Sequence, residues 1–172
     1  APISQSDQLL KKWRSSLNDE VYPCTPVAVP EETIIERILS SLNVHASNHP
    51  QKAAVIEAVN QERSLTYEQI HDRAFSFGSF LQAHGFSVGE RVTVALPNSI
   101  EFPVVHLGTW AAGGSVVGSI EAFKLHETVH QLRDSSSTVV VVSERTLNTI
   151  IDAAKQCPNV KMIICVRYSD GL

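Results

Sequence analysis

Cysteine is scarce in this sequence, and long apolar runs are missing from it. The three cysteines, Cys24, Cys157 and Cys165, form no Cys-x-x-Cys pair, which argues against a zinc knuckle and a redox dithiol. An odd, scattered set is typical of a reducing compartment. No stretch approaches the roughly 20 apolar residues of a membrane-spanning helix, and the first residues lack the apolar run of a secretory signal. We therefore expect a cytoplasmic protein, with the peroxisome as the alternative.

An excess of charge of one sign is also missing. The formal net charge is −4 with the seven histidines counted as neutral, and no basic patch dominates, so a nucleic-acid partner is not expected. The densest basic cluster consists of Lys11, Lys12 and Arg14 beside Trp13. A solvated helix face explains this cluster better than a contact with a membrane surface or an acidic partner does.

What the sequence does contain is a regular alternation of helical patterns and short apolar runs. Residues 1–30 are polar and interrupted by Pro23, Pro26 and Pro30, so we interpret them as an N-terminal extension. Residues 31–172 are interpreted as one α/β domain. The patterns predict helices at 31–42, from 66 to just before 85, and at 98–112, 124–134 and 145–156, and strands at 53–59, 91–96, 115–120, 138–143 and 161–166.

This order of elements predicts the fold class. Strands that alternate with helices through short links indicate an α/β fold with a mostly parallel sheet and helices on both faces. The runs at 139–142 and 162–166 are apolar without alternation, as strands buried on both faces are.

Two helices carry capping signals. Thr66 and Gln69 have the spacing of a capping box, and Gly85 stands where a left-handed closing residue is needed. Asn98 and Glu101 suggest a second capping box, although Pro103 makes the first turn of that helix irregular. The helix at 98–112 is apolar nearly all round, so we expect both of its sides to be covered. One side would be left open in the isolated chain, which is therefore expected to self-associate.

One motif matches a metalloprotease pattern. His126, Glu127 and His130 form H-E-x-x-H, which places two imidazoles on one face of a helix. A catalytic zinc also needs a third protein ligand, and no histidine follows His130. We therefore interpret this segment as an amphipathic, partly exposed helix and predict no metal site.

A second motif resembles a phosphate-binding loop. Residues 108–115 have nearly the required spacing, but glycine stands where the lysine must be, and the run ends a helix instead of beginning one. Helix termination and tight packing explain these glycines better. His106, in the preceding apolar helix, is interpreted as a satisfied core or interface residue, and Trp110 as a packing residue.

From residue 65 to residue 143 the sequence resembles the adenylate-forming enzymes, the family of fatty acyl-CoA ligases, 4-coumarate–CoA ligase and firefly luciferase. The resemblance rests on the order and spacing of short pieces. They are LTY at 65–67, Phe80 and Leu81 with Gly85, VGERV at 88–92, LPNS at 96–99, Glu101 and Phe102, Leu107 and Gly108, AGG at 112–114, HQL at 130–132 with Ser135, and the valines at 139–142.

This resemblance implies a two-step ligase that joins a carboxylate to AMP from ATP and then to coenzyme A, with Mg²⁺ beside the nucleotide. It covers about the first third of such an enzyme, so residues 31–172 would be an incomplete N-terminal subdomain that ends before the phosphate loop. One departure is Ile120, Glu121 and Ala122, where the family usually has an Asn-Pro pair. The departure changes a loop, so the resemblance does not establish to which specificity subgroup of the family the sequence is similar.

The resemblance assigns this segment the role of scaffold. We name no catalytic, cofactor-binding or metal-binding residue, and we expect neither ATP, Mg²⁺ nor coenzyme A to be bound by the isolated chain, which should be inactive. The expected partners are a carboxylic acid substrate, for the whole enzyme, and the remainder of that enzyme. Two alternatives stay open: a non-catalytic binding or interaction module, and an unrelated flavodoxin-like ligand-binding domain.

Overall fold

A computed structural model describes residues 32–58 and 62–167 of the chain. The chain divides into the units Ala1–Thr33 and Ile34–Leu172, and every helix and strand of the described residues belongs to the second unit. The extension expected at 1–30 lies outside the described residues, together with its basic cluster and Cys24. Among the described residues, no helix has both the length and the apolar character that crossing a membrane requires.

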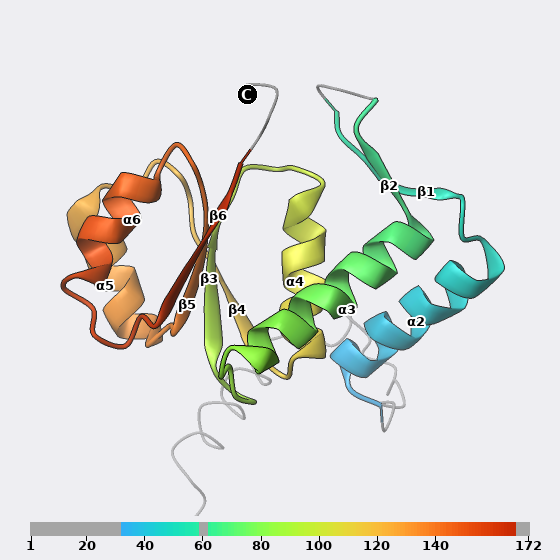
Figure 1. Cartoon of the computed structure of the whole chain (residues 1–172), viewed down its shortest axis with the longest axis horizontal. Helices are drawn as coiled ribbons and strands as arrows, with labels where there is room; N and C mark the ends of the chain where they lie inside the picture. Colours follow the sequence, from blue (N-terminus) through green and yellow to red (C-terminus); the bar gives the residue numbers. More distant parts are fainter. Residues whose placement is uncertain (1–31, 59–61, 168–172) are drawn as a thin grey trace, which may run out of the picture. The chain divides into compact units, whose positions relative to one another are not determined.

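Four strands form one parallel sheet in the order β4-β3-β5-β6. In this sheet Val94 lies level with Gly118 on one side and with Val141 on the other. The strand β3 is therefore flanked by the next two strands of the chain (Figure 1). The predicted parallel sheet is confirmed. Its strands are β3 (Arg91–Ala95), β4 (Ser115–Gly118), β5 (Val139–Ser143) and β6 (Met162–Val166).

Helices cover both faces of the sheet because the side chains of β5 alternate between them. Val139 and Val141 pack into one core with residues of α3 and α4, whereas Val140 and Val142 pack into another with residues of α5 and α6. Figure 1 shows the two helix pairs on opposite sides of the strands. The helices are α2 (Ile34–Asn48), α3 (Tyr67–Ala83), α4 (Glu101–Ala111), α5 (Leu125–Ser135) and α6 (Leu147–Ala154).

The strand β6 is less buried than its sequence predicts. Met162–Val166 is apolar without alternation, yet each of its residues is only half-buried, whereas every residue of β5 is buried. The physical reason is position, because β6 ends the sheet and has a neighbouring strand on one side only.

A strand forms within the range expected at 53–59, but it does not belong to the parallel sheet, so the predicted place of this strand in the alternating order is wrong. The strand β1 (Ala53–Ile56) pairs antiparallel with β2 (Ser64–Thr66), which the sequence patterns did not indicate. A short connection between two strands permits only an antiparallel pair, because a parallel pair needs a crossover of a dozen or more residues. This hairpin, α2, α3 and the start of α4 enclose a third core that contains Leu42, Leu65, Ile70 and Ile100.

The capping box predicted at the start of α3 is confirmed. The amide of Gln69 donates to the Thr66 hydroxyl at 3.2 Å, and the amide of Thr66 donates to the Gln69 side-chain oxygen at 3.0 Å. Behind this cap, Ile70, Ala74 and Leu81 form the buried stripe of the helix. Gly85 follows with a φ of 85°, which a residue with a Cβ adopts only at a cost.

The capping box predicted for the next helix is wrong. The residue before α4 is Ile100, which makes no side-chain capping bond. The carboxylate of Glu101 instead accepts a hydrogen bond from Arg63 Nη2 at 2.7 Å. Pro103 is the third residue of the helix, where amides have no acceptor within the helix, so its missing N–H costs little.

Glu90 makes stabilising contacts at the amino edge of the sheet, where the parallel strands begin. Its carboxylate pairs with Lys161 Nζ at 2.7 Å and accepts the Ser87 amide at 2.7 Å. The bond from Lys161 contributes most, and together these contacts hold the pKa of Glu90 below its ordinary value. A lowered pKa in the folded state stabilises the fold above the unfolded pKa of roughly 4.3, and this contribution is lost as the pH falls through the folded pKa.

We therefore expect Glu90→Gln to lower the free energy of unfolding near neutral pH by less than about 1 kcal/mol, because Lys161 is largely exposed. The difference between variant and wild type should shrink as the pH falls below roughly 4. Urea unfolding at both pH values measures it. A difference that is constant with pH would show that the carboxylate charge is not what stabilises this edge.

Candidate functional site

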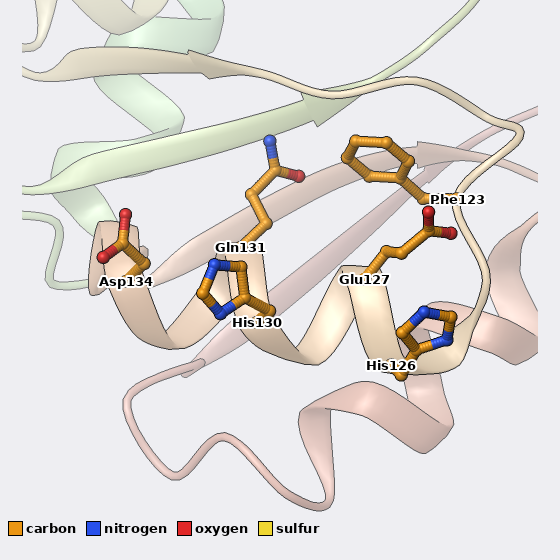
Figure 2. Close-up of a pocket in the computed structure, with 6 residues that line it drawn as sticks. All are labelled: Phe123, His126, Glu127, His130, Gln131 and Asp134. Atoms are coloured by element: carbon orange, nitrogen blue, oxygen red, sulfur yellow. The ribbon is translucent and has the colours of Figure 1, made fainter.

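The H-E-x-x-H segment lies along a groove of about 410 Å³ on the outer side of α5. Figure 2 shows the imidazoles of His126 and His130 on the exposed side of the helix, with Asp134 one turn further on. The groove is also lined by Phe123 and Gln131. The interpretation of this segment as an amphipathic, partly exposed helix is confirmed.

The side chains of Glu127 and Gln131, which also line this groove, each make one hydrogen bond that stabilises the fold. Glu127 caps its own helix, because its carboxylate accepts the Lys124 amide at 2.8 Å. The Gln131 amide nitrogen donates to the Gly118 carbonyl at 2.8 Å, which ties α5 to the end of β4. Within residues 32–58 and 62–167, no three His, Cys, Asp or Glu side chains are grouped so that they could hold a metal ion. The expectation that His126 and His130 bind no zinc stays a prediction.

The carboxyl edge of the parallel sheet is the place where open α/β sheets bind ligands, between strands whose connections leave in opposite directions. Here that point lies beside β3, because the chain passes to β4 on one side and then to β5 on the other. Ser143 ends β5 and is fully buried. Its hydroxyl donates a hydrogen bond to the carboxylate of Glu121, in the loop after β4.

This bond has a direct consequence for the chemistry of the edge. Since β3 lies between β4 and β5, the side chain of Glu121 reaches across the end of β3 to meet Ser143. A carboxylate there disfavours the binding of an anion such as a phosphate. The contact was missed at the level of sequence, and the available signal was the replacement of the usual Asn-Pro pair by Ile120 and Glu121.

The glycines at 108–115, in the segment that resembles a phosphate-binding loop, serve packing and helix termination, as the sequence predicts. Gly108 lies inside α4 against α3, where an added Cβ would be 2.5 Å from the Ala74 carbonyl oxygen. Gly113 follows the helix with a φ of 79°. An added Cβ at Gly114 would be 2.5 Å from the Phe86 ring. Gly108 lies within the helix, and Gly113 and Gly114 follow its carbonyl end, so these glycines present no set of amides to a phosphate.

The aromatic and histidine side chains of α4 form a row along its half-exposed side. The His106 Nδ1 nitrogen donates to the Phe102 carbonyl at 2.9 Å. The centroid of the imidazole lies 4.1 Å from the centroid of the Phe102 ring and 6.1 Å from that of the Trp110 ring. His106 thus has a hydrogen-bond partner in its own helix, as predicted, but it is half-exposed and does not lie in the core. Val105 is 5% exposed and belongs to the core between the sheet and the helices α3 and α4, against which Phe102 also packs.

The model of the family described as AMP-binding enzyme matches residues 42–171 of the sequence. The chain belongs to this family. The parallel sheet with helices on both faces is accordingly the N-terminal subdomain fold of adenylate-forming enzymes. This assignment removes the alternative of an unrelated flavodoxin-like domain.

Several curated relatives of this chain are ligases. It is 30% identical over 151 residues to a long-chain-fatty-acid–CoA ligase of Escherichia coli, covering 86% of this chain and 26% of the relative. It is 27% identical over 136 residues to acyl-CoA synthetase 7 of Caenorhabditis elegans, covering 79% and 25%. The chain thus spans about a quarter of the length of these relatives.

Solved structures agree with the fold. The anthranilate–CoA ligase AuaEII, in complex with anthranoyl-AMP, superposes with a TM-score of 0.72 at 22% identity, over 80% of this chain and 26% of that one. The N-terminal domain of FACL13 from Mycobacterium tuberculosis gives a TM-score of 0.68 at 27% identity, over 75% and 33%. The first likeness shows the fold alone, because its sequence identity is low.

Proposed function

We propose that this chain is part of an AMP-forming acyl-CoA synthetase. The whole enzyme would activate a fatty or aryl carboxylate with ATP to an acyl-adenylate, release pyrophosphate, and transfer the acyl group to the thiol of coenzyme A. The family match over residues 42–171 carries this proposal, and the acyl-CoA and fatty-acid ligases among the relatives support it. The remainder of such an enzyme would be the partner of this segment.

The residues described do not fit ATP or Mg²⁺. The glycines at 108–115 are occupied by packing and helix termination, the carboxyl edge presents the carboxylate of Glu121, and the described residues hold no cluster of metal-binding side chains. No step of the reaction is therefore assigned to them. In this proposal the segment supplies a rigid sheet, and the two valine-lined cores keep that sheet in place. Coenzyme A is likewise assigned to the whole enzyme.

The non-catalytic alternative differs from this proposal only in the activity of the whole protein. A cytoplasmic location stays a prediction, and so does self-association of the isolated chain. If the chain self-associates through α4, the half-exposed row of Phe102, His106 and Trp110 is the side to test. Val105 is not, because it lies in the core.

The isolated 172-residue chain is expected to catalyse no carboxylate-dependent exchange of pyrophosphate into ATP. The reason is that electrostatic stabilisation of the reacting phosphate needs preorganised donors, which the described residues do not provide. The measurement is radiolabelled exchange with a panel of fatty and aromatic acids, and an intact ligase of the family serves as the positive control. Exchange clearly above background would contradict the assignment of this segment as scaffold.

A further inference from the structure

We draw no further inference here: the strongest candidate, the apolar outer edge of β6 at the end of the parallel sheet, is half-buried and uncharged from Met162 to Val166 but carries no proposal, because nothing in the part of the chain that the structure describes shows what covers it.

Discussion

Replacing Arg63 with methionine is expected to lower the free energy of unfolding by about 3 kcal/mol. Arg63 joins two carboxylates, with Nη1 2.8 Å from Glu57 Oε2 and Nη2 2.7 Å from Glu101 Oε1. The Glu57 side chain is only 4% exposed. Removing the guanidinium leaves this carboxylate buried without its counter-charge, and the Coulomb attraction between the hairpin and α4 is lost as well. Urea unfolding followed by circular dichroism measures the change.

The matched control is Lys155→Met, which removes a pair with Asp152 whose side chains are 70% and 56% exposed. That change should cost less than about 0.5 kcal/mol, because exposed pairs contribute little. The double variant Glu57→Met with Arg63→Met should recover part of the loss, since it removes the stranded charge together with its partner. If Arg63→Met costs no more than Lys155→Met, burial of Glu57 does not make this contact important.

Replacing Gly108 with alanine is expected to lower the free energy of unfolding by about 2 kcal/mol. The added Cβ would be 2.5 Å from the Ala74 carbonyl oxygen and 2.8 Å from Phe77 Cδ1. Backbone of a neighbouring helix cannot move aside cheaply, so overpacking should cost about 3 kcal/mol. Alanine gains about 1 kcal/mol over glycine in helix propensity, which offsets only part of that cost. The same unfolding experiment measures the balance.

Gly118→Ala provides the control within the same chain. Gly118 ends β4, has no positive φ, and an added Cβ there meets nothing within 4 Å. We expect a change of less than about 0.5 kcal/mol. A Gly108→Ala protein that is as stable as wild type would show that α3 and α4 can separate, and that the close approach of the two helices is not required by the fold.

Local patterns were sufficient where neighbouring residues alone set the structure. The cap formed by Thr66 and Gln69 needs only two residues three positions apart, and the run of valines in β5 indicates a strand covered on both faces. The H-E-x-x-H segment was also predicted correctly to be an amphipathic, partly exposed helix. The resemblance to adenylate-forming enzymes rested on the order of such local pieces, and the family match agrees with it.

Prediction from the sequence was wrong or incomplete where a side chain could bind either a local or a distant partner. Glu101 has the correct spacing to cap its own helix with Asn98, but it binds Arg63, 38 residues away. Glu121 was visible only as a departure from a family pattern, and its bond to Ser143 depends on a sheet order that places β3 between β4 and β5. Such pairings depend on distances through space, which a pattern along the chain does not contain.

The sequence by itself therefore determined the fold class, most helices and strands, and the family, because each depends on hydrophobic period, turn residues and the order of short motifs. Tertiary structure alone decided that β1 and β2 form a hairpin outside the main sheet, that β6 is a half-buried edge, and that Gly108 is needed for the close approach of two helices. The physical reason is that burial and contact arise only when segments distant in the chain pack together, and each packing choice depends on all the others.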